Sequence, residues 1–270
     1  MYEFKYTRIE DIAVAEELLS GEDECVLLAG GMTLLPTMKQ RLAQPSQLLD
    51  LAGLPDLAGI TVTENSVSIR AMTTHAVVAS SERINERIPA LSALAGDIGD
   101  PQVRNRGTIG GSVANADPAA DYPAAVVALN GTVVTNHRSI AADEFFLDMF
   151  ETALEGNEIV TSVSFKIPSR AAYMKFPNPA SRYAVVGVFM AEYSGKYRIA
   201  VTGAKGSVFR LDSVEAALEN EASPESLNRA FKEYPVSGDE INEDIHASGE
   251  YRLHLIRVLT ERAFNQLAAG

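Results

Sequence analysis

The segment TIGGSVANADPAADYPAA, from Thr108 to Ala125, places two adjacent glycines and a run of small residues ahead of Asp121-Tyr122-Pro123. An acidic residue directly before an aromatic residue and a proline is typical of a helix start. The bare backbone ahead of that start has two explanations. It is either a tight turn followed by a helix cap, or a surface that an anionic group approaches closely.

A second segment near the N-terminus has the same layout. Leu27 to Thr33, with the sequence LLAGGMT, is typical of a strand, a double glycine, a hydroxyl residue and a helix start, and Gly107 to Ser112 offers the same elements. Successive backbone N–H groups form a concavity that binds anions, and a helix N-terminus adds about half a positive charge. Neither segment has the spacing GxGxxG, and GxxxxGK[ST] is absent from the sequence, which excludes a Rossmann or P-loop assignment. The residues alone leave two alternatives, simple turns or a pair of loops that grip both phosphates of a dinucleotide.

Composition narrows the function classes. The chain has 270 residues, 46% of them hydrophobic and 22% charged, which is enough for a large core and two or three lobes. Its net charge of −13 argues against nucleic acid or an anionic membrane surface as a partner. Cys25 is the single cysteine and the four histidines are scattered, so the chain alone offers no disulfide, no cysteine-ligated zinc and no iron–sulfur cluster. Because no signal pattern and no membrane-spanning apolar run is found, we expect a cytoplasmic protein.

Hydrophobic periodicity predicts an α+β chain whose character changes near Pro168. Before that residue we expect helices over residues 11–19, 34–42, 74–80, 89–96 and 124–129, a buried strand in 25–31, and further strands over 67–71, 132–136 and 163–167. After it, two long apolar strands flank Ser194-Gly195-Lys196, which is a hairpin signal.

The C-terminal third is predicted to be rich in helices. Asp212 and Glu215 have the spacing of a capping box, and Ser223-Pro224 opens a second helix. The acidic stretch 239–244 is expected to be a solvated loop. A final amphipathic helix is predicted from apolar residues at helical spacing: Ile256, Leu259, Ala263 and Leu267.

Longer stretches of the sequence resemble a known family. AGGMTLLPTMKQR (29–41) and IGDPQVRNRGTIGGSVANADPAADYPAA (98–125) are similar to the FAD-binding medium subunit of the molybdenum hydroxylases, which include xanthine dehydrogenase and aerobic carbon monoxide dehydrogenase. KFPNPASRYAVVGVF (175–189), AVTGA (200–204) and DIHASGEYRLHLIRVLTERA (244–263) resemble the C-terminal domain of the carbon monoxide dehydrogenase type. The resemblance covers nearly the whole chain.

The resemblance implies a fold in three parts. Residues 1–55 and 56–167 would form the two subdomains of an α+β FAD-binding fold of the vanillyl-alcohol oxidase type, with the flavin between them. Residues 168–270 would form a small antiparallel three-stranded sheet with helices, of the carbon monoxide dehydrogenase flavoprotein type.

The resemblance also implies FAD-binding residues, in two loops and at five single positions. The first loop comprises Leu28, Ala29, Gly30, Gly31, Met32, Thr33 and Leu34, and the second comprises Gly107, Thr108, Ile109, Gly110 and Gly111. Asp121 and Lys175 match polar residues near the cofactor, Tyr183 an aromatic residue that covers one face of the isoalloxazine ring, and Ile98 and Val160 apolar flavin neighbours. Each single position has a plain structural alternative: a helix N-cap for Asp121, a solvated lysine for Lys175, and core or interface residues for the other three. No residue of this chain is expected to act as a general acid, a general base or a metal ligand.

Partners are implied in the same way. A large subunit would carry the molybdenum–molybdopterin cofactor and a small subunit two [2Fe–2S] clusters, assembled as a dimer of heterotrimers. Electrons would pass from molybdenum through the clusters to FAD and then to a quinone or another acceptor. The complex would be cytoplasmic, and any attachment to the inner face of the membrane would be made through the assembly.

Carbon monoxide is the expected substrate of that complex, with a purine or an aromatic heterocycle as the alternative, and NAD remains open as the acceptor. Two other classes of function stay in view. One is a stand-alone FAD oxidoreductase, which would need a substrate pocket with its own acid. The other is a non-catalytic subunit that has lost its FAD site, against which the two glycine pairs and Asp121 argue.

Overall fold

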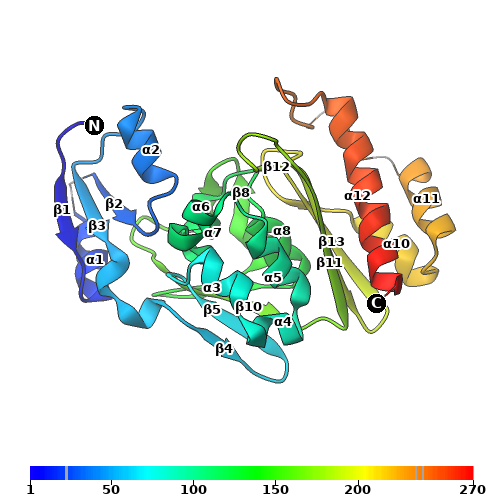
Figure 1. Cartoon of the computed structure of the whole chain (residues 1–270), viewed down its shortest axis with the longest axis horizontal. Coiled ribbons are helices and arrows are strands. Elements are labelled where there is room, and N and C mark those ends of the chain that lie inside the picture. Colours follow the sequence, from blue (N-terminus) through cyan, green and yellow to red (C-terminus); the bar gives the residue numbers. More distant parts are fainter. Residues whose placement is uncertain (22–23, 235, 239, 270) are drawn as a thin grey trace.

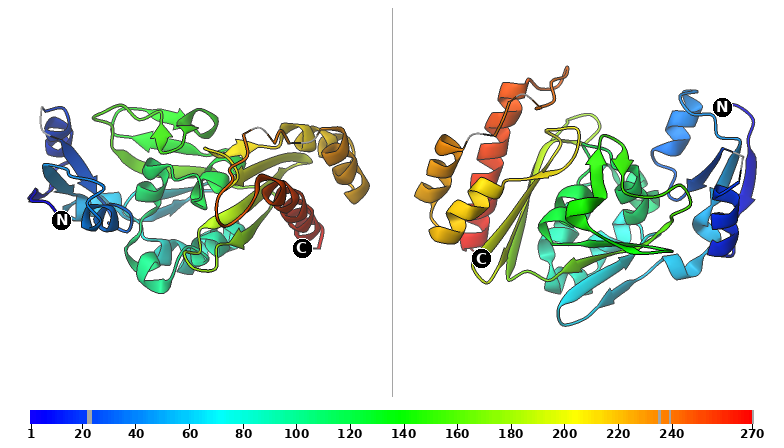
Figure 2. Two further views of the ribbon diagram at one scale, coloured as in Figure 1. Left: turned by 90° about the horizontal axis from the view of Figure 1, so that it is seen from above. Right: turned by 180° about the vertical axis from the view of Figure 1, so that it is seen from behind.

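The molecule contains three larger sheets, which follow one another along the chain and are surrounded by helices (Figure 1). The computed structural model describes residues 1–21, 24–234, 236–238 and 240–269. The N-terminal sheet and the C-terminal helices lie at opposite ends of the long axis, as the views from above and from behind also show (Figure 2).

The N-terminal subdomain is a parallel sheet with the strand order β1-β3-β2. It consists of β1 (Lys5–Arg8), α1 (Ile12–Leu19), β2 (Cys25–Leu28), α2 (Leu34–Lys39) and β3 (Gln47–Asp50). The Asp11 carboxylate caps α1 by accepting a hydrogen bond from the amide of Ala13. Ala15 and Leu49 form part of a small core, to which the central subdomain contributes Ile159.

The central subdomain is built on an antiparallel sheet with the order β4-β5-β10-β6-β7. Its strands are β4 (Ile60–Val62), β5 (Ser66–Arg70), β6 (Thr132–Thr135), β7 (Ser139–Ala141) and β10 (Val160–Lys166), and two 3-10 turns, Leu51–Gly53 and Pro55–Leu57, lead into it. Its helices are α3 (His75–Ser80), α4 (Glu82–Arg87), α5 (Pro89–Gly96), α6 (Pro101–Arg106), α7 (Ile109–Asn115), α8 (Tyr122–Ala128) and α9 (Ala142–Phe145), and β8 (Phe146–Asp148) pairs with β9 (Glu151–Thr152). Alternate residues of the sheet, including Ile69, Val163 and Phe165, are fully buried against these helices and form the largest core.

The C-terminal domain is an antiparallel sheet with helices on one face. The strands are β11 (Arg170–Pro177), β12 (Ala184–Tyr193), β13 (Lys196–Thr202) and β14 (Phe209–Arg210), in that order, and the helices are α10 (Asp212–Asn220), α11 (Pro224–Glu233) and α12 (Gly249–Ala269). Along β12, Val188 and Met190 pack with α10 and α12, whereas Phe189 and Ala191 face the central subdomain. Figure 1 shows this sheet standing between the central helices α5 and α8 and the C-terminal helices.

Most predicted elements are confirmed, including the hairpin at Ser194-Gly195, the helix after Ser223 and the C-terminal helix. The expected three-stranded C-terminal sheet has three long strands and a fourth of two residues, β14, at the edge beside β13. The acidic stretch is a loop whose carboxylate residues are exposed where it is described, whereas Ile241 and Asn242 are half-buried; residue 239 lies outside the described residues.

Three local predictions are wrong. The helix expected to reach Leu42 ends at Lys39, because Arg41 has a positive φ of 61°, and Leu42 is 75% exposed. The strand in 25–31 is only partly buried, because β2 lies at the edge of its sheet and Cys25, Val26 and Leu27 line a cavity. The capping box is absent: Leu211 is the N-cap of α10, and the Glu215 carboxylate instead accepts hydrogen bonds from the Ile199 amide and the Arg210 guanidinium.

Candidate cofactor site

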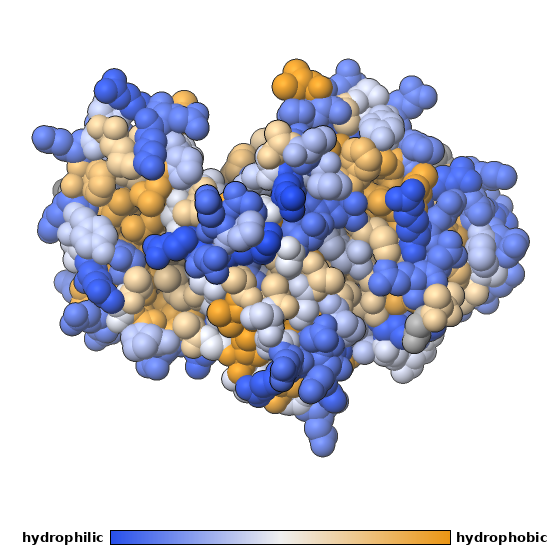
Figure 3. All heavy atoms as spheres, in the orientation of Figure 1, coloured by the Kyte–Doolittle hydropathy of each residue, from blue (hydrophilic) through white to orange (hydrophobic). Residues whose placement is uncertain are grey.

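A cleft of about 640 Å³ lies where the N-terminal subdomain, the central subdomain and the start of β12 meet. Its walls include β2, the loop before α2, the helix α7 and the residues just before β12. The space-filling view is indented between the N-terminal subdomain and the rest of the molecule (Figure 3). A concave site of this size with a largely apolar lining and a few polar groups is typical of sites for cofactors and other small molecules.

The first glycine loop presents free backbone donors to this cleft. Gly31 has a φ of +74°, a conformation that favours glycine, and the chain turns there from β2 towards α2. Within the described part of the chain, the five amides from Gly30 to Leu34 donate no hydrogen bond to a protein acceptor, and Leu35 is the first residue whose amide does so, to the Gly31 carbonyl. Consecutive unpaired amides lining a cleft form an anion-binding surface.

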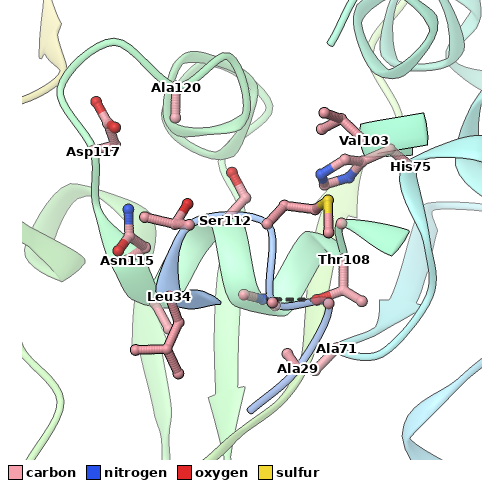
Figure 4. A pocket seen from close by; sticks show the side chains of 18 of the residues that line it. Ala29, Leu34, Ala71, His75, Val103, Thr108, Ser112, Asn115, Asp117 and Ala120 are labelled. Atoms are coloured by element: carbon pink, nitrogen blue, oxygen red, sulfur yellow. Dashed lines mark hydrogen bonds between the residues drawn. The ribbon is translucent and has the colours of Figure 1, made fainter. Parts of the chain in front are cut away.

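The second glycine loop is different, because in the described part of the chain four of its five amides have protein acceptors, and only the Thr108 amide has none. The Ile109 amide donates to the Thr73 carbonyl at 3.1 Å and the Gly110 amide to the Ala71 carbonyl at 2.8 Å. The Thr108 hydroxyl accepts from the Gly111 amide at 3.2 Å and so caps α7 (Figure 4). Farther along α7, the hydroxyl of Ser112 and the carboxamide of Asn115 are polar groups in the cleft lining.

The glycines of both loops are required where two pieces of backbone approach closely. A Cβ atom on Gly30 would lie 2.1 Å from the carbonyl oxygen of Arg106, so the first loop touches the chain just ahead of the second. A Cβ on Gly110 would lie 2.4 Å from the Cβ of Ala71, where α7 meets the end of β5. Gly30 thus serves the contact between the two subdomains, and Gly110 serves the packing of α7 on β5 within the central subdomain.

Asp121 lies in the cleft wall and is not a helix cap. Its backbone has helical angles and its side chain makes no capping bond. The carboxylate is 4% exposed and accepts a 2.5 Å hydrogen bond from the Tyr173 hydroxyl, and the Lys175 ammonium lies 2.8 Å away. Burial raises the pKa of Asp121, and the charge of Lys175 opposes that rise.

Lys175 itself does not line the cleft. Its side chain is 2% exposed and lies behind Asp121, where it also donates to the Asp97 carbonyl at 3.1 Å. The alternative of a solvated lysine is therefore wrong. Lys175 acts on the cleft through the Asp121 carboxylate.

Tyr183 reaches the cleft from the segment between β11 and β12. It is 41% exposed, burial raises the pKa of its hydroxyl, and the nearby Thr33 side chain opposes that rise. Tyr183 thus brings the C-terminal domain close to the first glycine loop in the cleft lining. Ile98 and Val160 add apolar surface to the cleft.

Of the seventeen cofactor residues predicted from the resemblance, three do not line the cleft. They are Lys175, Leu28 and Ile109, the last being fully buried. Residues that the sequence analysis missed include Cys25, Leu27, Met72, His75, Val103, Ser112, Asn115, Asp117 and Ala120. Ser112 to Ala120 follow the second glycine pair directly, so their position in the sequence was a usable signal. No sequence signal pointed to His75, because only the fold brings α3 beside Gly107.

His75 is a buried neutral imidazole at the edge of the cleft. It is 5% exposed, and burial lowers its pKa to about 4. Among the residues that the structure describes, neither its Nδ1 atom nor the hydroxyl of Tyr122 has a hydrogen-bond partner, and the centroids of the two rings are 5.4 Å apart. Figure 4 shows the imidazole beside Val103, on the opposite side of the cleft from Asn115 and Asp117.

A metal site and a membrane-spanning helix are both absent from the described residues. Among the described residues, no three His, Cys, Asp or Glu side chains are placed to hold a metal ion. No helix in the described ranges is both long and apolar enough to cross a membrane. Fold and cleft together define an α+β chain with a cleft at a subdomain boundary and a row of free amides in its wall, a site of the class that holds an anionic cofactor.

Comparison with known proteins identifies the family. Residues 2–169 match the FAD-binding domain in molybdopterin dehydrogenase, and residues 171–267 match the C-terminal domain of the carbon monoxide dehydrogenase flavoprotein. The nicotine 6-hydroxylase medium subunit of Paenarthrobacter nicotinovorans is 36% identical, over 98% of this chain and 97% of that protein. The carbon monoxide dehydrogenase medium chain of Hydrogenophaga pseudoflava is 34% identical, over 97% of this chain and 96% of that one.

Solved structures agree with these matches. A chain of the Hydrogenophaga pseudoflava carbon monoxide dehydrogenase, in a form that lacks the Mo-pyranopterin moiety of its cofactor, superposes with a TM-score of 0.91 over 99% of this chain and 98% of that chain. A chain of quinoline 2-oxidoreductase from Pseudomonas putida 86 gives 0.90 at 26% identity, over 100% of this chain and 98% of that chain. The chain belongs to the FAD-binding medium subunits of the molybdenum hydroxylase family, and it is an oxidoreductase subunit.

Proposed function

We propose that this chain binds FAD in the cleft, with the pyrophosphate on the first glycine loop, and passes electrons from the [2Fe–2S] clusters of a partner subunit to an external acceptor. The observation that carries the proposal is the row of five unpaired amides from Gly30 to Leu34 at the cleft wall. The first amides of a helix have no partner within the helix, and a phosphate supplies several acceptor oxygens for them.

The remaining lining fits the other parts of FAD. Ile98, Val160 and Leu27 offer apolar surface to a flat ring system, while Ser112 and Asn115 offer polar groups on α7. Bound FAD supplies the ability to exchange either one or two electrons, which links one-electron clusters to a two-electron acceptor.

The chain's own residues would bind, orient and shield this cofactor. The first loop would fix the phosphate end, and Tyr183, held near Thr33, would cover the open side of the cleft and exclude water. Asp121, ion-paired with Lys175, would place a compensated charge in the wall. No step of this role requires a general acid or base.

The chemistry at both ends of the electron path must come from other chains. With one cysteine, the sequence has no ligand set for an iron–sulfur cluster. We therefore propose a large molybdopterin subunit and a small iron–sulfur subunit as partners, in a dimer of heterotrimers, with a quinone or another small molecule as acceptor. The carbon monoxide dehydrogenase match of the C-terminal domain supports assembly of that kind.

The substrate proposal is carbon monoxide, with a purine or an aromatic heterocycle as the alternative. Its support is the C-terminal family match and the two carbon monoxide dehydrogenase medium chains among the relatives. Relatives of similar identity have names that refer to nicotine and glyceraldehyde. This range is expected, because in our proposal the large subunit, and not this chain, selects the substrate.

Two measurements test the proposal. The apo chain should bind FAD in a fluorescence titration, and the tagged chain should co-purify from its native cell with two further subunits, iron and molybdenum. A complex that reduces dye with carbon monoxide would support that substrate. A yellow chain that purifies alone and without metal would overturn the electron-transfer role and favour the stand-alone flavoenzyme, and a chain that binds no FAD would overturn both.

A further inference from the structure

Two side chains of β11 reach from the C-terminal domain to one wall of the cleft. Tyr173 and Lys175 are two residues apart and therefore share a face of the strand. That face packs on the central subdomain, where Tyr173 contacts the main core. The intervening residue, Met174, faces the opposite way, towards the core beneath α12.

Both side chains converge on the Asp121 carboxylate. The Tyr173 hydroxyl donates to Oδ1 at 2.5 Å, and the Lys175 Nζ atom lies 2.8 Å from Oδ1 and 3.1 Å from Oδ2. Lys175 supplies the opposite charge, and Tyr173 supplies a directed hydrogen bond that fixes the carboxylate plane. Asp121 lines the cleft whereas its two partners do not, so the C-terminal domain acts on this wall through one carboxylate.

A glycine on the neighbouring strand makes room for the Tyr173 hydroxyl. Gly187 of β12 stands opposite Lys175 in the sheet register, and a Cβ atom there would lie 2.6 Å from the Tyr173 hydroxyl. Glycine inside a strand weakens it and often marks a place where another group approaches closely. Here that group is the end of a rigid ring, so any side chain at position 187 would displace the hydroxyl.

We propose that Tyr173, seated over Gly187, is a positioning residue that holds Asp121 as an anion in the cleft wall, so that the C-terminal domain adjusts the reduction potential of the flavin. This inference rests on the proposed function, because it requires FAD in the cleft. A negative charge near a flavin disfavours the added electrons, and loss of that charge by protonation makes reduction easier.

The direction of the effect follows from the groups that face Asp121. They are Tyr173 and Lys175 of β11, Asp97 after α5, Tyr122 of α8, and Tyr183 across the cleft. Burial and Asp97 raise the pKa of the carboxyl, whereas Lys175 and the Tyr173 hydrogen bond lower it. Removing the hydroxyl should therefore let Asp121 take up its proton at a higher pH.

The test measures the midpoint potential of FAD bound to the full chain as a function of pH, by equilibration with reference dyes. Tyr173→Phe removes the hydroxyl, and Gly187→Ala keeps the hydroxyl but moves it. Asp121→Asn removes the titrating group. Tyr197→Phe is the matched control, because Tyr197 is 5% exposed in the same sheet but packs against Phe264 of α12.

We expect the wild-type profile to contain an inflection that Asp121→Asn abolishes. In Tyr173→Phe and Gly187→Ala this inflection should move to higher pH, and between the old and new inflections the flavin should be easier to reduce than in the wild type. Tyr197→Phe should follow the wild type. A merely structural role for Tyr173 would change stability without moving the inflection.

Profiles of Tyr173→Phe and Gly187→Ala that coincide with the wild type would overturn the inference and leave the proposed function intact. A wild-type chain that fails to bind FAD would overturn the proposed function itself. If Tyr173→Phe does not fold, difluorotyrosine at position 173 provides a test with the opposite sign, because its more acidic hydroxyl is a stronger donor and should move the inflection to lower pH.

Discussion

Gly30 is the position where a single added carbon should separate the two glycine loops. A Cβ atom there would lie 2.1 Å from the Arg106 carbonyl oxygen and 2.7 Å from its carbon, whereas ordinary contact begins at 3.4 Å. Both partners are backbone, so neither can rotate away. The loops must move apart by roughly 1 Å, and the cleft between them must widen.

The expected magnitude follows from the cost of overpacking, which is typically about 1–3 kcal/mol. The free chain can relieve this strain by letting the N-terminal subdomain move away, but FAD needs both loops in place. The strain should therefore appear in binding, and at about 1.4 kcal/mol per factor of ten, Gly30→Ala should raise the Kd for FAD by about 5-fold to about 150-fold.

The assay is a titration of apo chain with FAD, followed by quenching of flavin fluorescence. Gly96→Ala is the matched control, because its added Cβ would lie 3.8 Å from the Ala79 Cβ, an ordinary contact, and should leave the Kd unchanged. An unchanged Kd for Gly30→Ala would refute the reasoning. So would a loss of thermal stability in the apo chain without weaker FAD binding, since the contact would then not control the cleft.

Three further predictions concern buried ionisable groups. Asp121→Asn leaves the Lys175 ammonium buried without its partner. In urea denaturation this variant should lower the free energy of unfolding by about 3–5 kcal/mol, more than the ~1 kcal/mol expected for a lost helix cap. The double variant Asp121→Asn/Lys175→Met should recover most of that loss. Because burial lowers the pKa of His75 from 6.5 to about 4, the stability due to its neutral form is complete above pH 6.5 and is lost as the pH falls towards 4; thermal melts of His75→Asn should lack this acid-induced loss. Hydrogen bonds from Arg138 lower the pKa of Glu158 from 4.5 to about 2. The stability that the ionised Glu158 contributes is therefore complete above pH 4.5 and is lost as the pH falls to 2. Glu158→Gln should flatten the pH dependence of stability in that range, and an unchanged slope would contradict the assignment.

The two glycine loops illustrate how far sequence reasoning could go. They share a double glycine and a flanking hydroxyl residue, and the residues alone leave the same two alternatives for both, a simple turn or a surface of amides facing an anion. In the described part of the chain the amides from Gly30 to Leu34 are unpaired, whereas the amides of Ile109 and Gly110 donate to the carbonyls of Thr73 and Ala71. These carbonyls lie more than thirty positions upstream of the loop, so no local pattern could separate the two cases.

Asp121 shows the same limit at a single residue. Its place before Tyr122 and Pro123 is typical of a helix cap, and only the packing of β11 against the central subdomain gives the carboxylate different partners. Similarly, Glu215 has the spacing of a capping box but turns to the Ile199 amide, because α10 packs against β13. In both cases the carboxylate accepts a hydrogen bond from a partner distant in the sequence and not from the amide of its own helix start.

The sequence by itself determined the secondary-structure types, the late hairpin, the absence of an iron–sulfur ligand set and the family resemblance, since these depend on periodicity, composition and short motifs within single segments. The tertiary structure decided which amides remain free, which side chains line the cleft and which stand behind it. The physical reason is that hydrogen-bond satisfaction and burial depend on what packs opposite a residue. In this protein Arg106 packs against Gly30, Ala71 packs against Gly110, and Tyr173 donates to Asp121. Each of these partners comes from another part of the chain.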